Sequence, residues 1–144
     1  MATIRRAGLL ALIAIAVGAC AGTAPSEIPG PGGPILSGTG WRVVSVGGRL
    51  PAAGAPATIA FGVRDVTGSG GCNSFGGGYT FEPSTGRLAF GDNLAMTAMA
   101  CLEGPRNDFE TAFFQALIMV TNASLVAGRL TLSGPAGEIV LAPA

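Results

Sequence analysis

The chain has 144 residues, of which 11% are charged, and its eight basic residues balance eight acidic ones. This length suits one domain, and the absence of a basic excess argues against a nucleic-acid partner. All basic residues are arginine, and the chain has neither lysine nor histidine. These absences exclude a Ser-His-Asp triad and a P-loop, which needs a lysine after its glycines.

The first 19 residues have the pattern of a secretory signal peptide. Arg5 and Arg6 precede an apolar run at 7–19, which is too short to span a bilayer comfortably. A buried N-terminal helix is the alternative, but a run that is apolar on every side leaves a small domain no face for solvent. We therefore expect 1–19 to be removed from the mature protein.

The end of this run, VGAC at 17–20, resembles a bacterial lipobox with valine in place of the usual leucine. In lipoproteins the cysteine becomes the first mature residue and carries acyl chains such as palmitate, so we expect a membrane anchor at Cys20. Ordinary cleavage after Ala19 is the alternative, and it would leave Cys20 as an unpaired thiol. Ala21, in place of an aspartate, resembles the outer-membrane sorting pattern and indicates a domain that faces the periplasm.

A tether is expected next, at 20–39. Residues 21–38 hold four prolines and five glycines without apolar periodicity, which is typical of a linker that is part extended and part flexible. The folded domain is then expected at 40–144.

Short strands separated by turns follow. In 57–63 the residues Ile59, Phe61 and Val63 alternate with small residues and are expected on one face. Residues 78–92 predict a hairpin that turns at 83–86. The other expected strands are 41–48, 124–128, 129–134 and 138–143.

One segment, at about 107–120, has helical spacing instead. Its predicted buried positions are Phe109, Ala112, Phe113, Ala116, Leu117 and Val120, with Phe114 and Ile118 widening the apolar face. Asn107 and Glu110 have the spacing of a capping box. These elements predict a mainly β (α+β) fold, in which one helix packs on a curved antiparallel sheet.

The glycine-rich stretch GSGGCNSFGGGY at 68–79 raises the question of function. It cannot be a dinucleotide fingerprint, because a hairpin and not a helix follows it. A cysteine nucleophile at Cys72 lacks an activating histidine or lysine. Cys72 and Cys101 without histidine do not make a closed zinc site, so we expect no metal and no cofactor.

Paired carboxylates are the remaining catalytic possibility. The candidates are Asp65, Glu82, Asp92, Glu103, Asp108, Glu110 and Glu138. They are scattered along the chain, and we interpret each as a surface or capping charge. The sequence therefore gives no support to an enzyme.

In an exported protein the expected disulfide partner of Cys72 is Cys101, and two reduced, buried cysteines are the alternative. A disulfide would close a loop of about 30 residues and stabilise the domain by roughly 3.5 kcal/mol. Asn73 then suits a left-handed backbone or a hydrogen bond within its own loop, and the glycines suit positive φ or close backbone approach.

Four pieces in this order resemble the META domain of HslJ-like bacterial envelope lipoproteins, over residues 40–142. They are Trp41 at the first strand, GCNSFGGGY, LAMTAMAC and the FETAFFQAL helix. The motif positions are Trp41, Gly71, Cys72, Asn73, Tyr79, Thr97, Met99, Ala100 and Cys101. The family often has an aromatic residue between the helix and the next strand, and TNASL at 121–125 has none.

The resemblance implies a small, partly barrel-like domain covered by one helix, with no established catalytic activity. It implies a non-enzymatic envelope lipoprotein that serves envelope maintenance or tolerance of heat or antibiotic stress. The alternative is a binding module for a hydrophobic small molecule, a lipid or an envelope protein, because barrels of about eight strands can hold one ligand. That alternative depends on whether side chains fill the interior, namely Phe61, Phe81, Phe90, Phe113 and Leu117.

Overall fold

The computed structural model describes residues 35–102 and 104–144. The expected signal peptide, the lipidation site at Cys20 and nearly all of the tether lie outside these residues. Within the described part, no helix combines the length and the apolar character needed to cross a bilayer.

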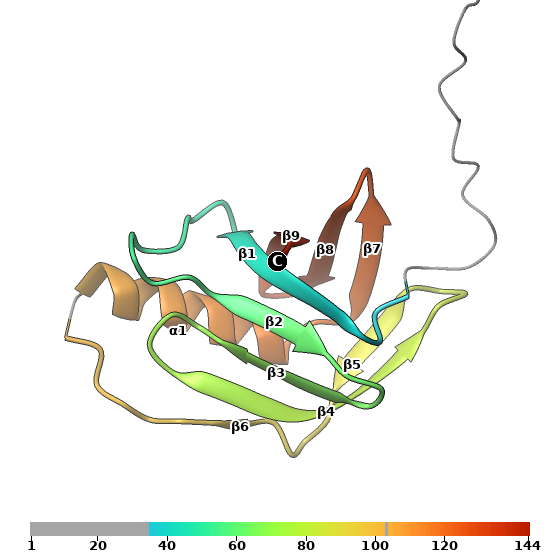
Figure 1. The fold of residues 1–144 in the computed structure, drawn as a ribbon, viewed down its shortest axis with the longest axis horizontal. Helices are drawn as coiled ribbons and strands as arrows, with labels where there is room; N and C mark the ends of the chain where they lie inside the picture. Colours follow the sequence, from blue (N-terminus) through green and yellow to red (C-terminus); the bar gives the residue numbers. More distant parts are fainter. Residues whose placement is uncertain (1–34, 103) are drawn as a thin grey trace, which may run out of the picture.

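The described residues form strands and one helix in a single antiparallel arrangement (Figure 1). The strands are β1 (Thr39–Val46), β2 (Thr58–Phe61), β3 (Asp65–Ser69), β4 (Ser74–Glu82), β5 (Arg87–Phe90), β6 (Ala95–Met96), β7 (Asn122–Val126), β8 (Arg129–Gly134) and β9 (Gly137–Pro143). The helix α1 spans Gly104–Ile118 and lies between β6 and β7 in the sequence.

Eight of the strands close into a barrel, in the order β3-β2-β1-β9-β8-β7-β5-β4 with β4 returning to β3. The first half of β4 pairs with β3, and its second half pairs with β5 on the opposite edge. The β5–β7 seam has one register pair, Arg87 with Asn122. The short β6 adds to β4 outside this closed ring. The mainly β, barrel-like fold that we predicted is therefore confirmed.

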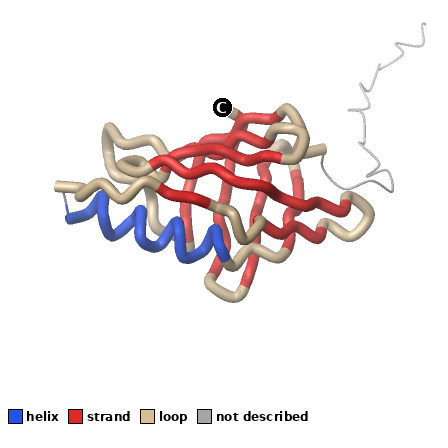
Figure 2. Tube along the Cα trace, turned by 90° about the horizontal axis from the view of Figure 1, so that it is seen from below, coloured by secondary structure: helices blue, strands red, loops and turns tan. Residues whose placement is uncertain are grey.

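Alternating strand residues and one helix face fill the barrel. The fully buried side chains include Ile59, Phe61, Val66, Leu88, Phe113, Leu117, Leu130, Leu132, Ile139 and Leu141. In β1 the alternation shifts after Val43, because a bulge between Val43 and Ser45 returns Val46 to the inside. The helix α1 packs along the barrel and contacts β1 and β9 (Figure 2).

The helix begins earlier than the capping pattern predicted. It starts at Gly104, so Pro105 occupies the first turn, where its missing N–H costs no helical hydrogen bond. Asn107 is inside the helix, and the predicted capping box does not form. Ile118 was expected to widen the buried face, but it is 57% exposed at the last turn of the helix.

Three further expectations need correction. Val63 is exposed because β2 ends at Phe61, two residues before it. Leu36, which we assigned to the tether, is buried in the core, so the folded part begins before residue 40. The stretch 68–79 is mostly strand: it contains the end of β3 and much of β4, and only 70–73 form the turn between them.

Candidate functional site

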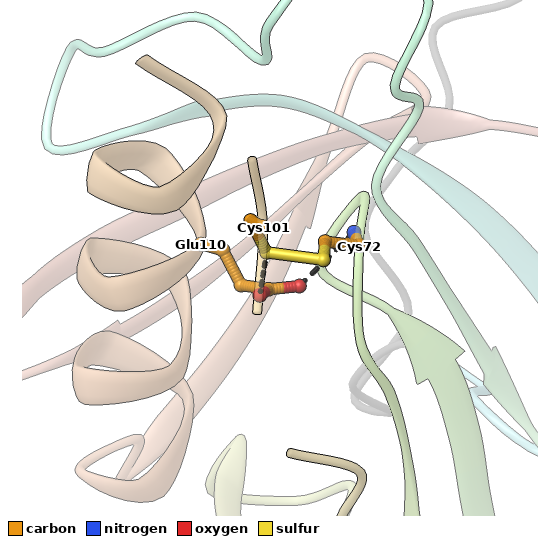
Figure 3. Close-up of side chains that lie close together, drawn as sticks. All are labelled: Cys72, Cys101 and Glu110. Atoms are coloured by element: carbon orange, nitrogen blue, oxygen red, sulfur yellow. Dashed lines mark hydrogen bonds between the residues drawn. A yellow bond between two sulfur atoms is a disulfide. The ribbon is translucent and has the colours of Figure 1, made fainter. Parts of the chain in front are cut away.

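The motif residues of the turn 70–73 meet the segment 94–102 and the first half of α1 beside β4. Cys72 and Cys101 form a disulfide there, with their Cα atoms 6.0 Å apart (Figure 3). The bridge joins the turn to the segment that precedes the helix, as the exported-protein interpretation predicted. We call Cys72, Asn73, Thr97, Met99, Cys101 and Glu110 the motif cluster.

Glu110 is the buried acid of this cluster, with 4% of its surface exposed. Its Oε1 accepts hydrogen bonds from the backbone N–H groups of Cys72 and Asn73, and its Oε2 accepts one from Asn73 Nδ2 at 2.7 Å. Oε2 also lies 3.1 Å from Cys101 Sγ (Figure 3). Three N–H donors therefore replace the water that this carboxylate loses on burial.

Asn73 links the turn to segment 94–102 through its side-chain amide. Its Oδ1 accepts from Met99 N at 2.7 Å, and its Nδ2 donates to Met99 O at 3.1 Å. Thr97 Oγ1 also donates to Oδ1, at 2.9 Å. The Asn73 amide thus bonds Met99 as a peptide group of a neighbouring strand would, and it extends the β4–β6 ladder by one residue before the start of β4 at Ser74. Its backbone is not left-handed, contrary to one of our expectations, because Ala127 alone among the described non-glycine residues has positive φ.

Two glycines have a physical role in this turn. Gly71 has a φ of 108°, which strains any other residue. At Gly70 an added Cβ would lie 2.7 Å from Glu110 Oε1, so the carboxylate could not approach the turn. The glycines therefore serve positive φ and close approach, as predicted.

Two motif residues lie elsewhere. Trp41 is a core residue of β1, and its Nε1 donates to Thr39 Oγ1 at 2.7 Å. Tyr79 packs edge-on against Phe61 and donates its hydroxyl to Gly62 O at 2.8 Å. Burial raises the pKa of the Tyr79 phenol above 10.0, and Asp65 adds to this effect. The motif positions therefore do not converge on a single site.

The chemistry available to the motif cluster depends on its sulfur atoms. One ligand atom each from Cys72, Cys101 and Glu110 lies within 4.8 Å of the others. In the disulfide, however, neither sulfur is the thiolate that a soft metal ion binds, and both Glu110 oxygens already accept hydrogen bonds. In this oxidised form the cluster is suited to fixing the backbone.

The other described carboxylates are exposed, as we predicted for surface charges. Exposed side chains are found at Asp65, Glu82, Asp92, Asp108 and Glu138, while Glu103 lies outside the described residues. Glu110 is the exception, and our interpretation of it as a capping charge was wrong. Its spacing of three from Phe113 and seven from Leu117 puts it on the buried helix face, and this signal could have identified it.

One apolar depression has a volume of about 480 Å³ and lies between residues 35–37, 63–64 and 79–83. Its lining includes Ile35, Leu36, Val63, Tyr79 and Phe81. Ile35 is 79% exposed and Val63 is 80% exposed. Apolar side chains at this place are therefore open to solvent.

Comparison with known proteins agrees with the motif pattern. Residues 35–143 match the family model of the META domain. A search of curated proteins found no match.

Three solved structures are similar to this chain. A protein from Burkholderia xenovorans, solved by NMR, is 25% identical with a TM-score of 0.58, over 74% of this chain and 81% of the other. A second protein solved by NMR is 26% identical with a TM-score of 0.62, over 75% of this chain and 91% of the other. The crystal structure of a DUF4847 family protein from Bacteroides vulgatus ATCC 8482 has a TM-score of 0.56, over 75% of this chain and 94% of the other. At 15% identity, that last likeness shows the fold alone.

Proposed function

Because the chain belongs to the META domain family, we propose that it is a non-enzymatic lipoprotein of the cell envelope. Its domain binds another envelope component and in this way supports envelope maintenance or tolerance of stress. The observation that carries the proposal is the structural role of the motif cluster. Its polar atoms bond the backbone of segment 94–102 and hold that segment on the surface, as a binding domain requires.

Glu110 supports the same view. A catalytic carboxylate has to reach its substrate, whereas Glu110 is buried and both its oxygens accept hydrogen bonds from the turn. The acid that is most closely surrounded by other motif residues is therefore suited to a structural task.

Attachment to the membrane is the second part of the proposal. The lipobox-like VGAC at 17–20 supports acylation of Cys20, and Ala21 supports transport to the outer membrane with the domain in the periplasm. The Cys72–Cys101 disulfide fits an oxidising compartment of this kind.

Membrane fractionation of cells that express the full chain tests the anchor. We expect Cys20→Ala to move the protein from the membrane to the soluble fraction. Cys72→Ser is the matched control, because it removes another cysteine and leaves Cys20 in place. A Cys20→Ala protein that stays in the membrane fraction would refute lipidation at this residue.

A hydrophobic small molecule or lipid is the alternative ligand, and the structure bears on where it could bind. Phe61, Phe113 and Leu117 are fully buried inside the barrel, while Phe81 and Phe90 are partly buried against the same core. These side chains occupy the space that an internal ligand would need. The depression beside Ile35 and Val63 is therefore the better candidate for a small apolar ligand.

Deletion of the gene tests the envelope function. We expect lower survival of heat, detergents and envelope-targeting drugs, with recovery on expression of the wild-type chain and weaker recovery with Cys20→Ala. Unchanged tolerance in the deletion strain would count against the proposal. Capture of the native protein from membranes, followed by mass spectrometry of proteins and lipids, would then identify what it binds.

A further inference from the structure

The outer edge of β6 is the feature that the motif cluster leaves unexplained. β6 pairs with β4 through Met96 with Phe75 and Ala95 with Gly76, and it ends the strand order. Among the described residues, no strand pairs with its other edge. Figure 1 shows β6 and the chain after it running along the rim of the molecule toward α1.

The hydrogen bonds define which backbone groups face outward. Thr97 N donates to Ser74 O at 2.9 Å, and Met99 N donates to Asn73 Oδ1, so both residues direct their N–H groups toward the barrel. In an extended chain successive residues direct these groups to opposite sides. Met96, Ala98 and Ala100 therefore face outward, and within 35–102 and 104–144 the N–H groups of Ala98 and Ala100 have no hydrogen-bond partner.

This edge lacks the features that usually prevent strand pairing. Residues 93–102, NLAMTAMACL, contain no charge and no proline. Most of their apolar side chains are open to solvent, with Met99 61% and Leu102 98% exposed, while Leu94 is partly buried. The Asn73 amide and the disulfide at Cys101 hold the segment in place, so little ordering remains for a partner strand to impose.

We propose that segment 95–101 pairs antiparallel with the same segment of a second copy of this chain, about a twofold axis at Ala98. The outward residues 96, 98 and 100 are symmetric about this axis, so Ala98 pairs with Ala98 and Met96 with Ala100. Each such pair exchanges two backbone hydrogen bonds. Large side chains meet small ones, and no like charges oppose each other. This self-pairing goes beyond the proposed envelope function and does not depend on it.

Photo-crosslinking of the full chain tests the interface. A benzophenone amino acid replaces Leu102, which lies at the end of the segment, and the protein is irradiated in intact cells. We expect a crosslinked product of twice the chain mass. Ala98→Pro removes the central outward N–H and should lower the yield about tenfold or more, whereas Ala98→Val keeps this N–H and should retain it. Residue 98 is exposed and takes no part in the inward hydrogen bonds, so the proline should not disturb the fold. An unchanged melting temperature will establish that the Ala98→Pro protein is folded.

A charge exchange at Ala98 tests the symmetry itself. Two differently tagged full chains, carrying Ala98→Lys and Ala98→Glu, are purified in mild detergent. Each alone places like charges opposite each other and should give about tenfold less dimer than wild type, while the mixture should restore the mixed dimer. The restored dimer should weaken as salt is added.

Three results would overturn the proposal. One is a wild-type chain that gives no crosslinked dimer, and another is a dimer that persists in a folded Ala98→Pro protein. The third is a Leu102 crosslink to a different protein or within the same chain, since the edge would then have another occupant.

Discussion

Two sides of the barrel are stabilised in different ways. On the side of β1, β9, β8 and β7, backbone ladders run almost without interruption. Residues 129–133 of β8 pair with β7, and residues 130–134 pair with β9. The inward residues of β8 and β9 are fully buried: Leu130, Leu132, Ile139 and Leu141. Many small contributions from hydrogen bonds and apolar contacts therefore hold this side together.

The segment 94–102 of the motif cluster has few ladder bonds. β6 makes two register pairs with β4, and residues 97–102 belong to no helix or strand. Here side chains replace the ladder: the Cys72–Cys101 disulfide, the Glu110 carboxylate and the Asn73 amide. The sequence motif thus marks the region where secondary structure alone does not fix the fold.

This difference predicts that single substitutions in the motif cluster lower the free energy of unfolding by more than the few atoms removed would suggest. Glu110→Ala should have the largest effect, a loss of about 3–5 kcal/mol in the free energy of unfolding. Three N–H groups lose their acceptor, and each unsatisfied buried donor costs about 1–3 kcal/mol. Denaturant unfolding of the full chain measures the loss.

Asp108→Ala is the matched control, since Asp108 is an exposed acid two residues earlier on α1. We expect it to change the free energy of unfolding by no more than about 0.5 kcal/mol. Equal effects of the two substitutions would show that Glu110 does not hold the turn.

Removal of the disulfide should have the next largest effect. The double variant Cys72→Ser, Cys101→Ser should lose about 2–5 kcal/mol, because the reduced chain regains the entropy of the open loop. The loss should be uneven: amide hydrogen exchange of 97–101 should accelerate before that of β8 and β9. A mass spectrum that finds free thiols in the oxidised wild-type protein, or a variant that melts like wild type, would contradict this role.

The same division explains what the sequence could predict. The ladder side follows from local patterns, since alternating apolar residues in β1, β8 and β9 and the turn signals between them indicate strands. The hairpin of β4 and β5 was also predicted, because the turn signal at 83–86 consists of adjacent residues. The cysteine pair followed from the exported character of the chain.

The motif side could not be predicted in the same way. β3 and β6 were missed, because β3 ends within the glycine stretch and β6 has two residues that are strand only because β4 lies beside them. Glu110 was taken for a capping residue, since its true partners, Cys72 and Asn73, lie 38 and 37 positions away. Contacts at such separations leave no local pattern, although the apolar spacing of α1 does show which way Glu110 faces.

Asn73→Ala tests the contribution of the side-chain amide within the motif cluster. It removes the peptide-like pair with Met99 and the bond to Glu110, and should cost about 1–3 kcal/mol. Hydrogen exchange at Met99 N should accelerate selectively. Asn93→Ala is the control, because Asn93 also accepts a backbone N–H, from Gly78, but does so at an exposed site. If both variants exchange alike at Met99, then Asn73 does not extend the ladder.

The smallest expected effect concerns Tyr79, on the part of β4 that joins the two sides. Tyr79→Phe removes the hydrogen bond to Gly62 O and should cost about 0.5–1.5 kcal/mol at neutral pH. Since burial, with Asp65, raises the phenol pKa above 10.0, folding favours the neutral phenol. The contribution of the Tyr79 phenol to stability is therefore fully present below pH 10, and it is lost as pH rises through the higher pKa of the folded state.

The composition makes this titration easy to isolate. The chain has no lysine and a single tyrosine, its basic residues are all arginine, and Cys72 and Cys101 are bonded. Arginine stays charged to about pH 12, so the phenol is the described side chain that titrates in the alkaline range. The stability difference between wild type and Tyr79→Phe should thus narrow above pH 10. Phenolate absorbance gives the folded pKa directly, and a value at or below 10.0 would contradict the partly buried, hydrogen-bonded phenol.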